Sequence, residues 1–187
     1  MPQTPEIRVA AMVLIGAVSP AFADELVFNG GFETGSFSGW FVPPNTPMQS
    51  NFRVEGVGIG GGHTGTYYAQ LSSTNLEFMS QILPTEPGQD YELSFWLRKP
   101  TIAPGRFVIR WEGQSIFDQF IAGSDIQAWR LFTFPLHSNI TGSFLEFGQD
   151  FFPGEFHLDD ISVVAVPAPS AAPLLLLGSS VALRRRR

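Results

Sequence analysis

Hydrophobic and polar residues alternate along most of the chain between residues 24 and 165, and Gly, Pro and Asn interrupt the alternation. The clearest stretch runs from Tyr91 to Arg98, directly after a turn signal at residues 87–90. Its odd-numbered positions are all apolar: Tyr91, Leu93, Phe95 and Leu97. A period of two places successive side chains on opposite faces of a β-strand, so this stretch is predicted to be a strand with one buried face.

Nine further stretches have a similar character. They cover residues 26–28, 52–57, 67–71, 78–83, 107–111, 116–120, 130–136, 143–147 and 156–164. No segment of this middle region shows a sustained helical period. Many short strands separated by turn residues predict an all-β fold, an antiparallel β-sandwich of the jelly-roll type.

The last of these stretches changes its alternation halfway along. Phe156 and Leu158 share one parity, whereas Ile161 and Val163 share the other. All four can face the core only if one extra residue is inserted between the two pairs, because a slip of one residue reverses the faces of a strand. We therefore predict a β-bulge at residues 159–160.

Charge is distributed unevenly along the chain. The net charge is -6, yet four of the 11 basic residues are the last four residues. Setting aside these four together with Arg8 and Glu6 leaves 6 basic and 16 acidic residues, a charge of -10 for the middle of the chain. Such a surface repels nucleic acid, which is not expected as a partner. The chain has no cysteine, which excludes disulfides, thiolate catalysis and cysteine-bound metals.

The first 23 residues have the layout of a signal peptide. Arg8 precedes an apolar run over residues 9–18, and the small residues Ala21 and Ala23 stand just before the expected cleavage position. Ten apolar residues are too few to cross a bilayer, which needs about 20. We expect a signal helix that signal peptidase removes between Ala23 and Asp24. The alternative is a buried first helix.

Residues 166–187 have the layout of a temporary membrane anchor. A proline-broken stretch is followed by about 13 mostly apolar residues and a basic end that resists translocation. This segment resembles the PEP-CTERM sorting signal, which has a Val-Pro-Glu-Pro motif, a short hydrophobic helix and a basic terminus. The matching residues are Val166, Pro167, Pro169, Arg184, Arg185, Arg186 and Arg187. The resemblance implies processing by an exosortase, although Ala168 stands where the family has Glu. The alternative is an ordinary C-terminal anchor.

The domain at 24–165 resembles the galactose-binding-like jelly rolls, which include many carbohydrate-binding modules. The resemblance is carried by residues 26–35 with 37–40, by 63–71, by 91–97 and by 156–163. It implies a single sandwich domain between the two targeting segments.

The same resemblance implies a structural Ca²⁺ ion between the first and last strands. Glu33 and Asp160 supply the matching carboxylates, and the backbone carbonyls of Gly31 and His63 are candidate further ligands. The alternative is that Asp159 and Asp160 cap the bulge by accepting hydrogen bonds from backbone amides.

A ligand-binding face is predicted from the residues that point away from the core. If the apolar positions of three strands face inward, the opposite positions carry aromatic, amide and guanidinium groups suited to a sugar. These residues are Tyr68, Gln70, Trp96, Arg98 and Arg110. The alternative is structural: a loop covers Trp96, and the arginines pair with surface acids.

Catalysis has little support in the sequence. The three histidines lie far apart without metal-site spacing, and adjacent aspartates on a strand do not form a glycosidase pair. We expect a non-enzymatic, exported protein that is held transiently in the inner membrane and then reaches the cell surface or matrix. There its module associates with extracellular polysaccharide. The alternatives are a structural surface protein without a small ligand and, with less support, a carbohydrate-active enzyme.

Overall fold

The computed structural model describes residues 24–45, 50–56, 61–122, 125–150 and 154–167. These residues form nine β-strands. The strands are β1 (Arg53–Glu55), β2 (Tyr68–Leu71), β3 (Glu77–Leu83), β4 (Asp90–Arg98), β5 (Gly105–Trp111), β6 (Gln114–Ile121), β7 (Arg130–His137), β8 (Ser143–Asp150) and β9 (Phe156–Ala165).

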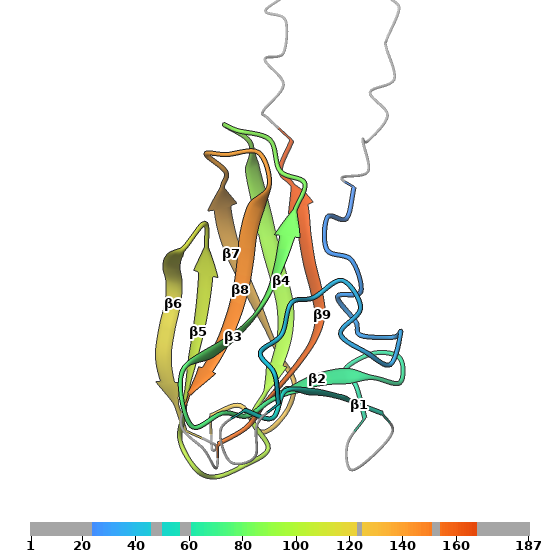
Figure 1. Cartoon of the computed structure of the whole chain (residues 1–187), viewed down its shortest axis with the longest axis vertical. Coiled ribbons are helices and arrows are strands. Elements are labelled where there is room, and N and C mark those ends of the chain that lie inside the picture. The colour runs from blue at the N-terminus through green and yellow to red at the C-terminus, as the bar shows by residue number, and fades with distance from the viewer. Residues whose placement is uncertain (1–23, 46–49, 57–60, 123–124, 151–153, 168–187) are drawn as a thin grey trace, which may run out of the picture.

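The strands pair into two antiparallel sheets that pack face to face (Figure 1). The five-stranded sheet has the order β1-β2-β9-β4-β7, and the four-stranded sheet has the order β3-β8-β5-β6. The predicted all-β sandwich is therefore confirmed. Neighbours in a sheet are mostly distant in the sequence, which is the strand order that periodicity alone does not specify.

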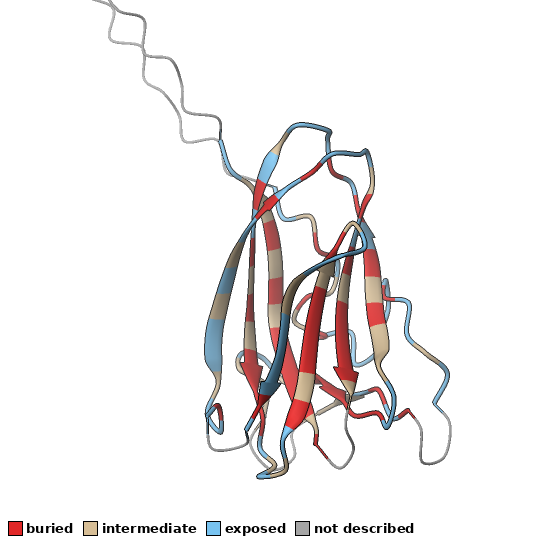
Figure 2. Ribbon diagram, turned by 90° about the vertical axis from the view of Figure 1, so that its left-hand side faces the viewer, coloured by how far each residue is buried: buried red, intermediate tan, exposed pale blue. Residues whose placement is uncertain are grey.

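The core consists of the side chains that both sheets turn inward. Alternate positions of β4 are fully or almost fully buried, and β5, β8 and β9 behave in the same way. Phe95 from β4 meets Phe147 from β8 with ring centroids 5.2 Å apart and edge-to-face geometry. Figure 2 shows buried residues along the whole length of the inner strands, often alternating with intermediate ones, whereas the edge strands β6 and β7 are largely exposed.

Most of the predicted strands are confirmed, with one exception at the start of the domain. Residues 26–28 form no strand, although Glu25 makes an isolated bridge with Val164 of β9. The chain turns away directly afterwards, because Asn29 and Phe32 adopt positive φ angles of 55° and 57°. Gly30 passes so close to β9 that a Cβ there would lie 1.9 Å from the carbonyl oxygen of Ile161. The segment thus contacts the sheet without extending it.

The predicted bulge in β9 is confirmed. Ser94 pairs with Ser162 and Trp96 with Asp159, so Phe95 alone lies opposite two residues of β9. Asp160 has a positive φ of 48°, which fits the extra residue of a bulge. The slip lets Leu158 and Ile161 both face the core, with 0% and 3% of their surface exposed.

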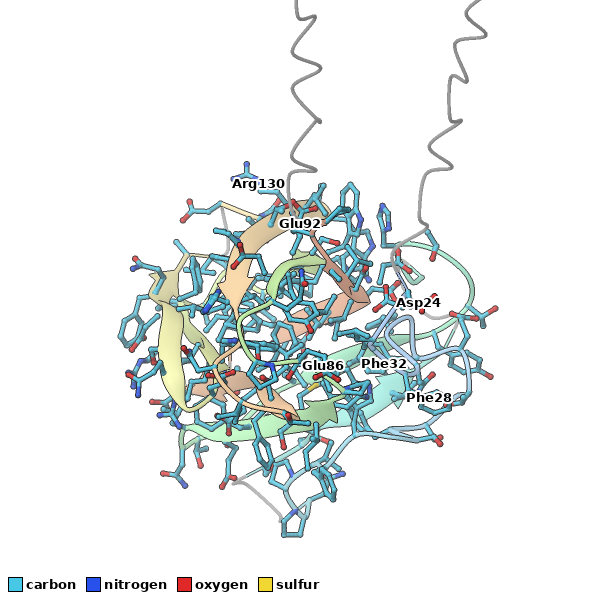
Figure 3. All side chains as sticks on the ribbon, turned by 90° about the horizontal axis from the view of Figure 1, so that it is seen from above. Asp24, Phe28, Phe32, Glu86, Glu92 and Arg130 are labelled. Carbon is cyan, nitrogen blue, oxygen red and sulfur yellow. The ribbon has the colours of Figure 1, made fainter. Side chains whose placement is uncertain are left out.

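The N-terminal segment runs along one flank of the sandwich. Figure 3 shows Asp24, Phe28 and Phe32 on this flank, away from Glu92 on β4 and Arg130 on β7. Among the residues that the structure describes, no helix has the length and apolarity needed to cross a membrane. The predicted signal helix, the processing residue Ala23 and the tail from residue 168 onward lie outside those residues.

Candidate functional site

A polar pocket lies on the outer face of the five-stranded sheet, at the end formed by β1, β2 and the start of β9. Its volume is about 370 Å³. Its lining residues are Arg53, Glu55, Tyr68, Gln70, Pro100, Glu155 and His157. The register explains why they meet, since Gln70 pairs with Arg53 on one side and with His157 on the other. Strand alternation turns all three side chains away from the core.

Arg98 from β4 lies next to this pocket and is almost fully buried. Its guanidinium lies 5.3 Å from the ring centroid of Tyr68 and 4.6 Å from that of Trp129. Its Nε donates to Nδ1 of His157 at 3.1 Å, and its Nη2 donates to the carbonyl oxygen of Gly61 at 3.1 Å. Stacking and directed hydrogen bonds hold this cation in place.

Glu155 is one of the two carboxylates that line the pocket. Its Oε2 accepts a 2.6 Å hydrogen bond from Nε2 of Gln70, and its Oε1 lies 3.4 Å from Nε2 of His157. Gln70 is fixed in turn, because Nη2 of Arg53 donates to its Oε1 at 3.1 Å. Arg53 also forms an ion pair with Glu55.

The protonation of this group follows from its contacts. The contact with His157 holds the pKa of Glu155 below its usual value, against the opposing effect of burial. Burial lowers the pKa of His157, and the charge of Arg98 lowers it further, against the effect of Glu155. At neutral pH the pocket therefore presents an ionised Glu155 beside a neutral imidazole.

The structure brings three of the five predicted ligand residues together. Tyr68 and Gln70 line the pocket, and Arg98 packs against Tyr68. Trp96 lies farther along β4, where the His63 ring stacks on it with centroids 3.7 Å apart. This matches the structural alternative for Trp96, in which a loop covers the indole.

Arg110 is not part of this group. It lies on β5 of the other sheet, with its guanidinium 4.2 Å from the ring centroid of Phe78. The sequence placed Arg110 on an outward face but did not show which sheet contains β5.

Sequence reasoning missed four of the polar residues that line the pocket: Arg53, Glu55, Glu155 and His157. His157 carried a usable signal, because its parity is opposite to that of Phe156 and Leu158 and predicts an outward side chain. Arg53 and Glu55 carried the same signal, because they alternate with Phe52 and Val54 in the predicted strand at 52–57. Glu155 carried none, since it lies just before β9.

The four residues predicted to surround calcium also lie together, beside the β9 bulge. His63 Nδ1 lies 2.6 Å from Oδ2 of Asp160, and a Cβ at Gly31 would lie 3.4 Å from Oδ1 of the same aspartate. Gly31 thus leaves a small cradle that carboxylate oxygens face. Glu33 is two residues beyond Gly31, but its carboxylate accepts hydrogen bonds from the amide of Thr66 at 2.9 and 3.1 Å and from the amide of Tyr67 at 2.8 Å.

Oxygen donors of this kind suit a hard cation such as Ca²⁺. In the described part of the chain, however, no three His, Cys, Asp or Glu side chains are grouped closely enough to hold a metal by themselves. Any ion in the cradle would need backbone carbonyls or water as well.

Asp159 is the more buried member of the aspartate pair. Its Oδ2 accepts hydrogen bonds from the amides of His63 at 2.6 Å and Thr64 at 3.4 Å, and its Oδ1 accepts one from the amide of Asp160 at 2.8 Å. These are the contacts of the capping alternative. Burial, with the charge of Asp160, nevertheless raises the pKa of Asp159 to about 7. Binding of a proton or a nearby cation would therefore reduce the unfavourable energy of this buried negative charge.

Comparisons with known proteins relate this geometry to a recognised fold. The sequence matches no protein-family model, and no curated protein matches it. Two solved carbohydrate-binding modules are similar in structure. The CBM22-1 xylan-binding domain of Xyn10C from Paenibacillus barcinonensis aligns with a TM-score of 0.60 and 16% identity, covering 81% of this chain and 100% of that domain. TmCBM61, solved with β-1,4-galactotriose, aligns with a TM-score of 0.57 and 18% identity, covering 77% and 100%.

A third similar structure belongs to a much longer protein. The enzymatically active domain of tailspike protein 4 from bacteriophage CBA120 aligns with a TM-score of 0.57 and 13% identity. The match covers 76% of this chain but 21% of that one. At these identities the likeness concerns the fold. The described chain is an antiparallel two-sheet sandwich that resembles the jelly rolls of carbohydrate-binding modules.

Proposed function

We propose that this protein is a non-catalytic polysaccharide-binding protein that holds its ligand in the pocket between β1, β2 and β9. The observation that carries the proposal is the convergence of Tyr68, Gln70, Glu155 and His157 around one open surface pocket on a fold that resembles carbohydrate-binding modules. Ligand pockets of this size commonly combine an apolar surface with a few fixed polar groups that orient the ligand.

The chemistry of the pocket supports binding without catalysis. Hydrolysis of a glycosidic bond requires one carboxyl group that is protonated as a general acid. The pKa of Glu155 is held low by its contact with His157, so this group serves as a hydrogen-bond acceptor and not as a proton donor. Sugar hydroxyls are matching donors.

Export and sorting belong to the same proposal and rest on the sequence. The segment before Asp24 supports removal by signal peptidase, and the tail from Val166 to Arg187 supports transient retention in the inner membrane and processing by an exosortase-type enzyme. The mature domain would then act at the cell surface or in the matrix, where exopolysaccharide is the available ligand.

A calcium ion beside Gly31 is the cofactor we propose, with Glu33 and Asp160 as its carboxylates. Its role would be structural, because this position joins the N-terminal segment to β9 and its residues do not line the pocket. It would offset the negative charge at the bulge.

The test of polysaccharide binding is affinity electrophoresis of the purified full chain in gels that contain the exopolysaccharide of a producing bacterium. We expect retardation for the wild-type chain and its loss in Glu155→Ala. Arg110→Gln is the matched control, since Arg110 lies on the other sheet and should leave retardation unchanged. Migration that is the same with and without polysaccharide would remove the proposal.

The second candidate is a structural surface protein without a small ligand. The stacking of His63 on Trp96 favours this second candidate, because the indole face that would bind a sugar is covered by a side chain of the protein itself. Trp96→Ala is therefore expected to lower stability in either case. The structural candidate is preferred under two conditions. The wild-type chain binds no glycan, and the only effect of Glu155→Ala and of Trp96→Ala is a change in stability.

A further inference from the structure

The groups that line the pocket differ in how far a ligand can reach them. The side chains of Glu55 and Glu155 are 37% and 27% exposed. Gln70 and His157 lie beneath them with only 5% and 4% of their surface exposed. Arg53 is exposed but is engaged with Glu55 and Gln70. A ligand entering the pocket therefore meets the carboxylates of Glu55 and Glu155 together with the guanidinium of Arg53, which is already paired with Glu55.

The hydrogen bond from Arg98 determines where the proton of His157 lies. A guanidinium has donors but no acceptor, so Nδ1 of His157 must accept from Nε of Arg98. The ring proton of the neutral imidazole is then on Nε2. This atom is buried and makes no aligned hydrogen bond within the described chain, but Oε1 of Glu155 lies 3.4 Å from it. The N–H group thus lies close to the carboxylate of Glu155 and interacts with its charge, without an aligned hydrogen bond.

Gln70 supports the same carboxylate from the other side. Because Arg53 donates to its Oε1, the amide of Gln70 is oriented with Nε2 toward Glu155, where it donates to Oε2 at 2.6 Å. Both oxygens of Glu155 therefore face donors that are themselves held by arginines. A carboxylate oxygen has two lone-pair sites, so each retains the capacity to accept from a ligand.

We propose that Arg98 and Gln70 are positioning residues that hold Glu155 as the hydroxyl-accepting group of the pocket, and that the site selects neutral glycans over glycans with carboxylates. This inference rests on the proposed function and specifies its ligand class. A neutral sugar donates hydrogen bonds from its hydroxyl groups to Glu155 and Glu55. A uronic acid brings a third negative charge beside them, and the nearest guanidinium groups already have partners within the protein.

The first test compares binding of neutral and acidic oligosaccharides by isothermal titration calorimetry with the full chain. Xylohexaose and β-1,4-galactotriose are the neutral probes, and an oligogalacturonate of similar length is the acidic probe. We expect at least one neutral probe to bind at least 10-fold more tightly than the acidic probe. Glu155→Gln should weaken neutral binding about 10-fold and reduce the discrimination, whereas Arg110→Gln should change neither. Equal or tighter binding of the oligogalacturonate overturns the selectivity.

The second test measures the tautomer of His157 directly and does not depend on any glycan. Nitrogen-15 NMR of the labelled imidazoles, assigned with His63→Gln and His137→Gln, should show His157 with its proton on Nε2. Arg98→Lys removes the Nε donor and should shift His157 toward a mixture of tautomers. Arg110→Lys should leave the spectrum unchanged. A wild-type chain with the proton on Nδ1, or with averaged tautomers, overturns the positioning role.

The two tests separate the failure of this inference from that of the proposed function. If no probe or exopolysaccharide binds, the proposed function and its ligand class fail together, while the tautomer result still decides the role of Arg98. If neutral and acidic probes bind equally, polysaccharide binding stands and the selectivity fails.

Discussion

Asp159 is a buried carboxyl group whose pKa is raised far above its ordinary value. It is fully buried, and three backbone amides donate to its carboxylate. These hydrogen bonds favour the ionised form, whereas burial and the neighbouring charge of Asp160 disfavour it more strongly. The balance places its pKa near 7, which makes the folded state sensitive to pH in a range where most carboxylates are already ionised.

The pH dependence of stability should therefore include a contribution from Asp159. Its pKa rises from 3.8 in the unfolded chain to about 7 in the folded one, so the folded state binds more protons between these values. Stability then falls as the pH rises through this interval. The free energy of unfolding can be measured with urea, in EDTA, at pH 5 and at pH 7.5. Its decrease between the two pH values should be larger in the wild-type chain than in Asp159→Asn, by on the order of 1 kcal/mol. Asp24→Asn, at an exposed position, is the control. Equal losses in all three chains would contradict the assignment.

Sequence reasoning at this scale succeeded where parity controls position. Tyr68, Gln70 and Arg98 lie outside the core between the sheets, as alternation predicts, although they are almost fully buried there. The bulge follows from the change of parity in β9. It did not reveal that Arg98 would be covered by Trp129, or Trp96 by His63. Trp129 and His63 lie in loops, and the sequence of a loop has no hydrophobic period from which its position can be predicted.

At the scale of elements, β9 and the loop at residues 61–67 connect the N-terminal segment to the five-stranded sheet through side-chain hydrogen bonds. His63 and Thr64 contact the two aspartates of the bulge, and Thr66 contacts Glu33. These links connect segments about 30 and 95 residues apart in the chain. The sequence predicted that Glu33, His63 and Asp160 would meet, because the resemblance to jelly rolls supplied the strand order that alternation lacks.

Calcium should stabilise this connection if the cradle beside Gly31 holds the ion. For a dissociation constant of 10⁻⁴ to 10⁻³ M, as in extracellular modules, 10 mM Ca²⁺ would add about 1.4 to 2.7 kcal/mol to the free energy of unfolding. Thermal unfolding should therefore shift upward in Ca²⁺ relative to EDTA, and the shift should shrink in Glu33→Gln and Asp160→Asn. Coincident unfolding curves in the two buffers would show that no calcium ion is bound. The two aspartates would then serve only to cap the bulge by accepting hydrogen bonds.

The edge strand β7 protects the five-stranded sheet from further pairing. It pairs with β4 on one side and forms the end of the sheet on the other. Pro135 is exposed within this strand and has no amide hydrogen to offer another strand. Leu131, four positions earlier in the same strand, is 51% exposed, so the edge also presents an apolar side chain to a second strand.

Pro135→Thr should consequently promote self-association. Threonine restores an amide donor and favours the extended backbone, so pairing between two β7 edges becomes possible. Size-exclusion chromatography with light scattering should show a larger species for Pro135→Thr at protein concentrations where the wild-type chain is smaller. Thr133→Val, which adds no amide donor, controls for apolarity. The same apparent mass in all three chains would show that the proline has no protective role.

For the molecule as a whole, the fold was predictable from the sequence and the ligand was not. Alternating aromatic and aliphatic side chains specify two sheets around one core, and this requires no knowledge of the strand order. A pocket, in contrast, depends on which strands become neighbours. Gln70 and His157 come to lie side by side because β2 pairs with β9, although 87 positions separate them in the sequence.

The acidic surface and the two flanking segments give the remaining prediction, which concerns the fate of the whole chain. Processing at both proposed positions would remove Arg8 and the arginines at 184–187, which are five of its 11 basic residues, and leave a strongly acidic domain. Intact-mass spectrometry of the protein from its native envelope should then find a species that begins at Asp24 and ends near Val166. A mutant tail with Arg184 to Arg187 changed to Gln should be translocated more readily and lose its membrane-bound intermediate. An intact chain that starts at Met1 in the cytosol would contradict export, whereas a chain lacking residues 1–23 but retaining its tail would contradict exosortase processing alone.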